Sequence, residues 1–231
     1  MKIYFIRHGD PNYKDNCLTP LGHLQAEALA ERWAASSEKV DRIYSSKYGR
    51  AVETAEHTAA KLGLPVEILD FMHEISTGRP DVTDEAEKER LSPWLGSGRY
   101  LEGGMNLASA DPETLDLYAE TRMMENDRRV VTGFDAWFAE QGYVREGLGY
   151  RCVRKNDETV LIFAHGGSIS CLLGHFIGTN AVHACCFFRI RCTGICEVQF
   201  KGEEGEFVHP AFYSVADSAH AAEIKYTEPE N

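Results

Sequence analysis

The sequence lacks the features that would point to a membrane, secreted or nucleic-acid-binding protein. No apolar run approaches the roughly 20 residues of a membrane span, and no charged and then apolar leader of a secretory signal opens the chain. Positive charge is scarce, because 24 Lys and Arg face 36 Asp and Glu and give a formal net charge of −12. This balance disfavours nucleic acid and anionic membrane as partners. We therefore expect a cytoplasmic protein that binds neither.

Motifs for cofactors and structural metals are also missing. The chain has no phosphate-binding P-loop and no dinucleotide fingerprint, so no cofactor is expected. Its seven cysteines form no paired C-x-x-C spacing and lie mostly in apolar runs. This pattern favours reduced core thiols over a disulfide or zinc framework. What remains is an ordinary globular composition, 43% hydrophobic and 26% charged, in a 231-residue chain long enough to bury a full core.

The amino-terminal segment places reactive side chains directly after a strand. Residues 2–6 (KIYFI) are a short apolar run typical of a buried strand. Arg7, His8 and Gly9 follow with no spacer, at the strand end where open α/β sheets keep their ligand crevice. Gly9 permits a sharp turn and the close approach of a ligand. Taken alone, the tripeptide is equally typical of a strand end with a solvated Arg and an exposed His.

Later segments predict alternating strands and helices. Thr19 and Pro20 suit the capping and first positions of a helix that continues to about residue 36. Short apolar runs predict strands at 40–44, 65–69 and 159–164, with further late strands at 185–191 and 194–200 near a sheet edge. Helices are expected over 51–62 and 169–177. The fold class that follows is α/β, a three-layer sandwich with a mostly parallel central sheet flanked by helices.

One long segment does not fit the alternation. Residues 78–157 are rich in charges, glycine and proline, and contain no strand-like run of any length. Asp111, Pro112 and Glu113 suit the start of a long helix towards Phe138. We expect a single domain over residues 1–231, in which 78–157 form a helical cap insertion. The polar end of the chain, from about residue 218, is expected to fray.

Two histidines and two arginines occupy matching positions in this scheme. His8 follows the first strand, His165 follows the strand at 159–164, and Arg7 and Arg50 lie at strand ends or strand-to-helix junctions. The carboxyl ends of parallel strands share one edge, so the four side chains are expected to converge. Guanidinium groups and helix amino-terminal amides bind phosphate, and an imidazole among cations stays neutral and nucleophilic. The pattern predicts a phosphoryl-transfer pocket without a metal.

At these residues the chain resembles the histidine phosphatase superfamily, the phosphoglycerate mutase-like family. The matching motifs occur in the family's order and span residues 2–178, leaving the cap unmatched. They are Arg7-His8-Gly9, Leu18-Thr19-x-x-Gly22, Ser45-Ser46-x-x-x-Arg50-Ala51-x-x-Thr54-Ala55, Glu74 and Ala164-His165-Gly166-Gly167. The resemblance implies that His8 is the nucleophile that becomes phosphohistidine. It also implies that Arg7, Arg50 and His165 bind the transferred phosphoryl group.

The resemblance further implies that Glu74 is the acid and base of the reaction. It would protonate the leaving alkoxide and then deprotonate the incoming water. Acting as an acid requires a raised pKa, which partial burial beside Phe71 and Ile75 would provide, while the arginines oppose it. The neighbouring His73 is a rival for this role.

The chain departs from the family pattern after its first motif. The family shows Glu or Gln and then an Asn about six residues on, whereas here Asp10, Pro11 and Asn12 follow, with Asn16 further along. Asn12 and Asn16 are therefore both candidates for a phosphate contact. The loop and basic clamp that would mark a phosphoglycerate mutase are not recognisable, which favours a phosphatase.

These observations lead to one expected function and two alternatives. We expect a metal-independent phosphatase that hydrolyses a phosphomonoester of a small metabolite through phosphohistidine. The alternatives are a phosphomutase of the same family and a non-catalytic phospholigand-binding protein, although the complete set of site residues argues against the latter. The expected partner is a small phosphorylated substrate. The apolar late strands suit a homodimer edge, and they equally suit strands covered by their own chain.

Overall fold

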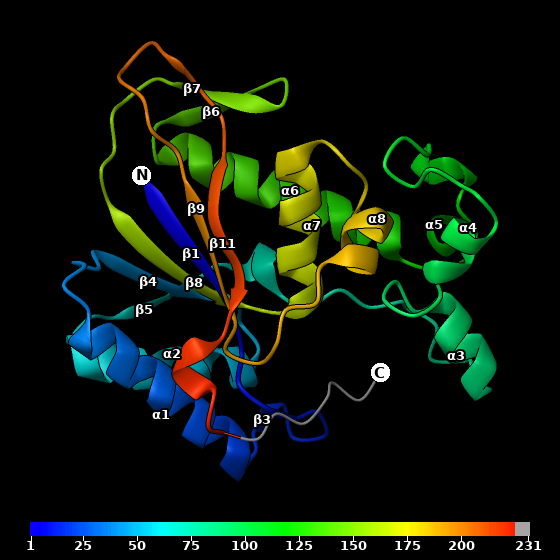
Figure 1. Ribbon diagram of the computed structural model, residues 1–231, viewed down its shortest axis with the longest axis horizontal. Coiled ribbons are helices and arrows are strands. Elements are labelled where there is room, and N and C mark those ends of the chain that lie inside the picture. Colours follow the sequence, from blue (N-terminus) through cyan, green and yellow to red (C-terminus); the bar gives the residue numbers. More distant parts are fainter. Residues whose placement is uncertain (225–231) are drawn as a thin grey trace.

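A six-stranded sheet forms the centre of the computed structural model, which describes residues 1–224 (Figure 1). The strand order is β11-β9-β1-β8-β4-β5. The parallel strands are β1 (Lys2–Arg7), β4 (Arg42–Ser45), β5 (Val66–Ile68) and β8 (Thr159–Ala164). β9 (Ile195–Gln199) runs antiparallel to β1, and β11 (Ala211–Asp217) runs antiparallel to β9. Helices flank this sheet, so the predicted α/β class with a mostly parallel sheet is confirmed.

Two helices cover one face of the sheet, α1 (Pro20–Ala35) and α2 (Gly49–Leu62). α1 begins as predicted, because the Thr19 side chain accepts a hydrogen bond from the Gly22 amide. α2 ends at Gly63, whose φ of 66° places it in the left-handed region that glycine readily adopts. Leu29 and Trp33 of α1 pack on β1 in a small apolar core. The two helices thereby fix the loops that follow β1 and β4.

The opposite face carries the larger core, beneath α6 (Met123–Glu140) and α7 (Gly166–Ile177). Phe134 and Phe138 of α6 form an aromatic cluster with Phe5 of β1, Phe176 of α7 and Phe200. These aromatic side chains of α6 are therefore packing residues of the core. α6 begins within the segment expected to form the cap, yet its second half is buried against the sheet.

Short helices between β5 and α6 project to one side of the molecule (Figure 1). They are η1 (Asp70–Met72), α3 (Glu85–Leu91), α4 (Gly98–Glu102), η2 (Pro112–Thr114) and α5 (Asp116–Glu120). Arg90 of α3 and Arg99 of α4 both contact the carboxylate of Asp116, each at 2.7 Å. These ion pairs join the three short helices α3, α4 and α5. The division into a single domain with a cap over 78–157 stays a prediction.

The long helix predicted from residue 111 is wrong, because the chain breaks it into η2, α5 and α6. Thr121 lies at the break in an extended conformation, with φ −131° and ψ 177°. Its hydroxyl contacts the Leu117 carbonyl and accepts a hydrogen bond from the Met123 amide. A threonine side chain that bonds the neighbouring backbone competes with helix continuation.

The statement that residues 78–157 contain no strand is also wrong. β6 (Tyr143–Glu146) and β7 (Gly149–Cys152) form an antiparallel hairpin, and β10 (Phe207–Val208) adds a third strand. Gly147 turns the hairpin with a φ of 56°, as expected for a tight turn between strands. Buried Tyr143 and Tyr150 pack this small sheet on Phe138.

Of the two late strands, the second is confirmed as β9 and the first is wrong. Residues 185–187 end helix α8 (Ala181–Phe187), which starts where the Asn180 side chain accepts a bond from the His183 amide. A short apolar run suits a buried helix as well as a strand, and packing against α7 decides here. β9 is also not an edge strand, since β11 covers it. The homodimer stays a prediction.

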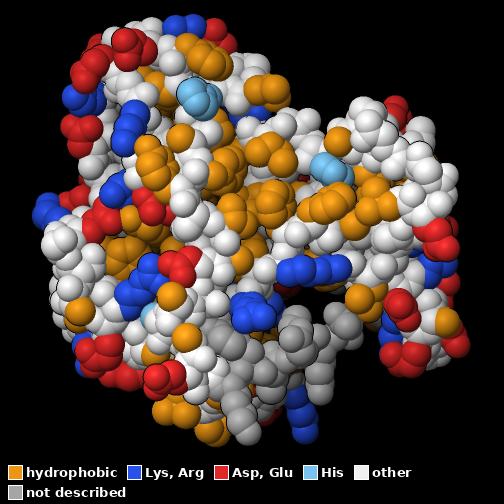
Figure 2. All heavy atoms as spheres, in the orientation of Figure 1, with side chains coloured by type: hydrophobic (Ala, Val, Ile, Leu, Met, Phe, Trp, Pro, Cys, Tyr) orange, Lys and Arg blue, Asp and Glu red, His pale blue; other side chains and the backbone are white. Residues whose placement is uncertain are grey.

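Apolar side chains gather on the surface over α7 and α8 (Figure 2). Ile177 of α7 and Phe187 of α8 are exposed.

The seven cysteines are free thiols and five are buried, as predicted. Over residues 1–224 no single helix is long and apolar enough to cross a membrane; α7 and α8 pass that test only as a pair bent by 112°. Of the end predicted to fray, η3 (Ala219–Ala221) is described, and 225–231 lie outside the described residues.

Candidate active site

The register of the sheet brings the two predicted histidines together. Arg7 of β1 lies opposite Ala164 of β8, so His8 and His165 follow at the same level of neighbouring strands. Their ring centroids are 5.1 Å apart. Ser46 follows β4 at the same edge, and its amide donates to the Phe163 carbonyl at 2.8 Å. The carboxyl ends of three parallel strands therefore form one site, as expected.

Close backbone contacts fix the loop after His8. A Cβ on Gly9 would lie 2.6 Å from the Gly22 carbonyl oxygen, closer than van der Waals contact permits, so only glycine fits. The Gly9 amide donates to the Thr54 hydroxyl at 3.0 Å, and that hydroxyl donates to the Arg50 carbonyl at 2.7 Å. Strand β1 is thus tied to both α1 and α2 immediately beside His8. The short strands β2 (Pro11–Asn12) and β3 (Cys17–Leu18) then return the chain to α1.

His8 is almost fully buried, with 1% of its surface exposed. Burial lowers its pKa well below the ordinary value, and the charges of Arg7 and Arg50 add to the effect. Its Nδ1 lies 2.6 Å from the Gly9 carbonyl oxygen. A carbonyl only accepts, so a neutral His8 carries its proton on Nδ1 and leaves the lone pair of Nε2 available.

Two buried arginines lie beside this imidazole. Arg7 donates from Nη1 to the Ile190 carbonyl at 2.7 Å, which holds it against the loop before β9. Arg50, at the start of α2, donates from Nη1 to the Asn16 side chain at 2.8 Å. The rings of Tyr13 and Tyr48 flank the Arg50 guanidinium at 5.3 and 4.9 Å. Both guanidinium groups are therefore fixed in place.

The site contains buried donor atoms that no protein group satisfies. The Nε atoms of Arg7 and Arg50 and the Nδ1 of His165 have no hydrogen-bond partner among the described residues. His165 Nε2 is occupied, since it lies 2.7 Å from the Ser46 hydroxyl oxygen. When that hydroxyl donates to Nε2, Nδ1 carries the proton and is itself a donor. Such buried donors suit an anion with several acceptor oxygens.

Glu74 lies at the amino terminus of α7. Its Oε1 accepts from the amides of Ile75, Gly167 and Ser168 at 2.9, 3.1 and 3.2 Å. Burial raises the pKa of this carboxyl, while the Ile75 amide and Arg7 oppose the rise. The helix terminus therefore orients a carboxyl whose pKa is raised, next to the cationic pocket.

Gly167 is required by the contact between α7 and Glu74. A Cβ there would lie 2.3 Å from Ile75 Cγ1 and 2.5 Å from Glu74 Oε1. We expect Gly167→Ala to lower the free energy of unfolding by about 1–3 kcal/mol through this overpacking, measured by urea denaturation.

The preceding glycine provides the matched control. A Cβ on Gly166 would meet its nearest neighbour, Arg7 Nε, at 3.7 Å, an ordinary contact. Gly166→Ala should therefore leave stability within about 1 kcal/mol of the wild type. Equal losses in both variants would show that the Glu74 contact does not decide the residue at position 167.

His73 is the alternative to Glu74 for the role of acid and base, and both nitrogens of its ring have partners in the protein. Its Nδ1 lies 2.6 Å from the Asp70 carbonyl oxygen, and its Nε2 contacts the guanidinium of Arg129. Both ring nitrogens are thus engaged, the first as a donor and the second as an acceptor. This geometry favours Glu74 as the candidate acid and base.

The two candidate asparagines differ in what they contact. Asn16, with a φ of 54°, accepts the bond from Arg50 described above. Asn12 instead closes a local turn, accepting from the Asp15 amide at 3.2 Å and donating to the Asp15 carboxylate at 2.9 Å. The structure therefore brings Asn16, and not Asn12, to an arginine of the site. Contact of either with phosphate stays a prediction.

Three residues support the site in ways that the sequence interpretation did not assign to them. Ser46 holds His165, Thr54 holds the loop after His8, and Arg129 contacts the segment that carries Glu74. The first two lie within the matched motif from Ser45 to Ala55, and Thr54 lies one helical turn after Arg50. No local signal distinguishes Arg129 from the other arginines of its segment.

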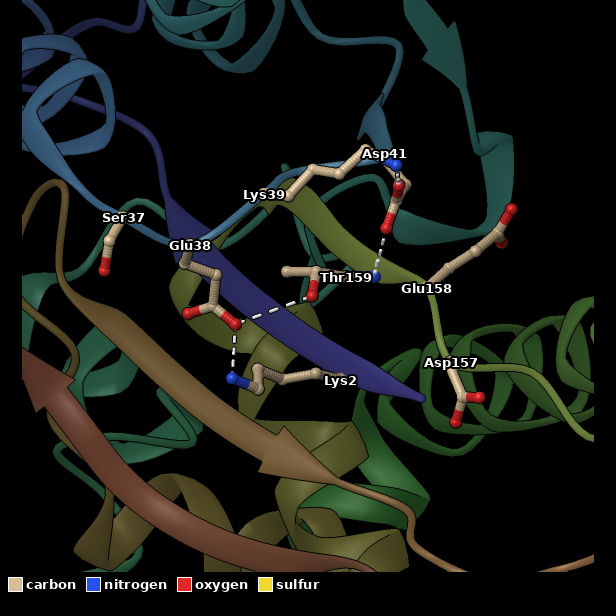
Figure 3. Close-up of a pocket in the computed structure, with 8 residues that line it drawn as sticks. All are labelled: Lys2, Ser37, Glu38, Lys39, Asp41, Asp157, Glu158 and Thr159. Carbon is tan, nitrogen blue, oxygen red and sulfur yellow. Dashed lines mark hydrogen bonds and ion pairs between the residues drawn. The ribbon is translucent and has the colours of Figure 1, made fainter.

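A further open hollow lies at the opposite end of the strands (Figure 3). It is lined by Lys2, Ser37, Glu38, Lys39, Asp41, Asp157, Glu158 and Thr159. Glu38 contacts Lys2, and Asp41 accepts from the Thr159 amide at 3.0 Å. With four carboxylates and two lysines, this hollow is unsuited to a phosphate. Within residues 1–224 no group of His, Cys, Asp or Glu is arranged to hold a metal ion.

Known proteins resemble this chain in sequence. A model of the histidine phosphatase superfamily (branch 1) matches residues 3–116. A protein described as putative phosphoserine phosphatase 2, from Hydrogenobacter thermophilus, is 25% identical over 224 residues, which cover 90% of this chain and 94% of that protein.

Solved structures share the fold along nearly the whole chain. A mycobacterial glucosyl-3-phosphoglycerate phosphatase superposes with a TM-score of 0.63 at 20% identity, covering 93% of this chain and 97% of the other. A mutant phosphoserine phosphatase from Entamoeba histolytica, in complex with phosphoserine, gives 0.60 at 19%, covering 95% and 98%. The family model over residues 3–116 and the order of the motifs at the strand ends agree in their likeness to the histidine phosphatase superfamily, and the solved structures share the fold.

Proposed function

We propose that this protein is a metal-independent phosphatase that hydrolyses a phosphomonoester of a small metabolite through phosphohistidine at His8. One observation carries the proposal. A neutral imidazole with its Nε2 lone pair available lies among Arg7, Arg50 and His165, and the buried Nε atoms of both arginines and Nδ1 of His165 have no partner within residues 1–224. That arrangement suits a nucleophile facing a bound phosphoryl group.

In the first step, Nε2 of His8 forms a bond to phosphorus while the ester P–O bond breaks. The Nδ1–H bond to the Gly9 carbonyl holds the ring and stabilises the positive charge that develops on it. Charge in the transition state spreads over the three equatorial oxygens of the phosphoryl group. Donors fixed before the reaction stabilise this charge without reorganising, and Arg7, Arg50 and His165 provide them.

Glu74 provides the proton that the leaving oxygen needs. Its raised pKa favours the protonated form, which donates to the departing alkoxide. Ionised Glu74 then takes a proton from water, whose oxygen attacks phosphorus and breaks the bond to His8. Phosphate leaves, and Glu74 and His8 return to their starting states.

The named relatives support a phosphatase over a mutase. The matched relatives and structures described above carry the names phosphoserine phosphatase and glucosyl-3-phosphoglycerate phosphatase. A further Entamoeba histolytica structure contains 3-phosphoglyceric acid. Each of these names concerns a small phosphorylated metabolite, and we extend only that class of substrate to this chain.

The test is phosphate release from a panel of sugar phosphates, nucleotides, phosphoglycerates, phosphoserine and an aryl phosphate, each with and without excess chelator. We expect release from at least one metabolite ester, at a rate that the chelator does not change. The two arginines of the site, Arg7 and Arg50, provide the positive charge that a metal would otherwise supply. Loss of activity in chelator that returns with a divalent cation would contradict the metal-independent mechanism.

The same assay separates the alternatives. Phosphoryl transfer to an added hydroxyl compound that outpaces phosphate release would indicate a phosphomutase. Tight binding of phosphate with no turnover of any ester would indicate a phospholigand-binding protein.

A further inference from the structure

Arg129 of α6 reaches the segment that carries Glu74. Its Nη2 donates to the His73 carbonyl oxygen at 2.8 Å and lies 3.5 Å from the Glu74 carbonyl oxygen. Its Nη1 contacts Nε2 of the His73 ring. One guanidinium group from a helix of the main core thus holds the backbone on both sides of the peptide bond between His73 and Glu74.

The His73 ring completes this attachment. Its Nδ1 donates to the Asp70 carbonyl in η1, which leaves Nε2 to accept from Arg129. Burial lowers the pKa of His73, and the charge of Arg129 adds to this, so the ring stays neutral. His73 therefore acts as a neutral bridge between the arginine and the turn before Glu74.

Arg129 differs from Arg90, Arg99 and Arg122 in what it contacts. Arg90, Arg99 and Arg122 each form an ion pair with a carboxylate, whereas Arg129 forms none within residues 1–224. It contacts backbone carbonyls, the His73 ring and the Asn126 side chain, and its buried Nε has no partner in the described part of the chain. Placing a guanidinium in a partly buried setting without a counterion costs free energy. An arginine needed only for surface charge would not occupy this position.

We propose that Arg129 is a positioning residue for Glu74. The amides of Gly167 and Ser168 hold the carboxylate, and Arg129 holds the backbone from which that side chain extends. Together they fix the carboxyl at two points relative to the ester oxygen. The inference rests on the proposed role of Glu74 as the general acid. A displacement of about 1 Å at such a group lowers the rate by up to about 100-fold.

The test uses esters whose leaving groups differ in their need for a proton. Nitrophenolate is a stable anion and leaves unaided, phenolate (pKa about 10) is intermediate, and an alkoxide such as that from glycerol phosphate needs a proton. Only the first turnover is measured, because it reports phosphorylation of the enzyme and excludes the later attack of water. We expect Arg129→Met to slow the alkyl ester about 10- to 100-fold and the nitrophenyl ester by less than about 3-fold.

Two variants control for charge and folding. Arg128→Met removes the exposed neighbour on α6 and should change neither rate. Arg129→Lys keeps the charge but not the forked donor, so we expect an intermediate loss confined to the poorer leaving groups. Urea denaturation of each variant establishes that it folds, and the lysine variant carries the test if the methionine variant does not.

Glu74→Gln separates failure of this inference from failure of the proposed mechanism. Suppose that Glu74→Gln slows the alkyl ester much more than the nitrophenyl ester. If the Arg129 variants then slow all esters equally, or slow no ester, Arg129 does not position the acid. If Glu74→Gln itself slows all esters equally, the acid role of Glu74 is wrong. If both residues give the same dependence, with the larger loss at Glu74, the positioning role is supported.

Discussion

Replacing His8 with alanine is expected to lower phosphate release by about 10⁴- to 10⁶-fold, the range seen when an enzyme loses its nucleophile. Removing the ring leaves the cationic pocket but takes away the atom that bonds to phosphorus. Water would then have to attack without activation, although the arginines would still stabilise the phosphoryl charge. The measurement is steady-state phosphate release on the best ester of the panel.

His23→Ala is the matched control for that prediction. His23 lies on α1, where half of its side chain is exposed and its ring contacts His57. Its removal takes away the same side chain outside the site, so activity should stay within about twofold of the wild type. A folded His8→Ala protein that retains more than about a tenth of the activity would exclude His8 as the nucleophile.

Replacing Glu74 with glutamine is expected to lower the first-turnover rate on alkyl phosphates by about 10²- to 10⁴-fold. The amide oxygen of glutamine still accepts from Gly167 and Ser168, so the geometry at the start of α7 is kept. The variant cannot transfer a proton to the leaving oxygen. For a nitrophenyl ester, which needs no proton, we expect less than about a threefold change in release of nitrophenol.

The later steps of the Glu74→Gln reaction provide a second observable. In the proposed mechanism, hydrolysis of phosphohistidine also uses Glu74, so we expect the nitrophenyl ester to give a rapid burst of nitrophenol followed by slow turnover. Glu113→Gln, an exposed carboxylate in η2, is the control and should behave as the wild type does. An alkyl ester that reacts at the wild-type rate in Glu74→Gln would assign the acid role to another group.

The framework of this fold could be predicted because its elements carry local signals. Thr19 and Pro20 mark the start of α1, and Gly63 and Gly178 mark the ends of α2 and α7 with positive φ. The strand at 159–164 is buried along its whole length, and its residues 160–164 are all apolar, as is typical of a strand with both faces covered. His8 and His165 could be placed at one site for the same reason, since parallel strands align their carboxyl ends.

The errors had different causes, and long-range packing decided only one of them. The run at 185–191 is apolar enough for a strand, and only its contact with α7 makes part of it helical. Thr121 breaks the long helix through bonds of its own hydroxyl, which propensity alone does not predict. The hairpin around Gly147 had a usable signal, because a glycine between two short alternating runs is typical of a tight turn.

Within the site, sequence motifs identified the histidines and arginines at the strand ends more readily than the residues that hold them in place. Arg129 lies more than 50 positions from His73, and its role depends on where α6 crosses the loop after β5. Asn16 and Asn12 could not be separated by sequence either, because the distinction depends on which one the turn directs towards Arg50.

The most direct test of the mechanism is detection of the covalent intermediate. Wild-type protein is mixed with a phosphorylated substrate, quenched in alkali within the first turnover, digested, and mapped by mass spectrometry, with His8→Ala beside it. We predict one phosphoryl group on His8, stable in alkali and lost in acid, and none in the variant. First-turnover product without phosphorylated protein, or a phosphoryl group on His165 instead, would contradict the account.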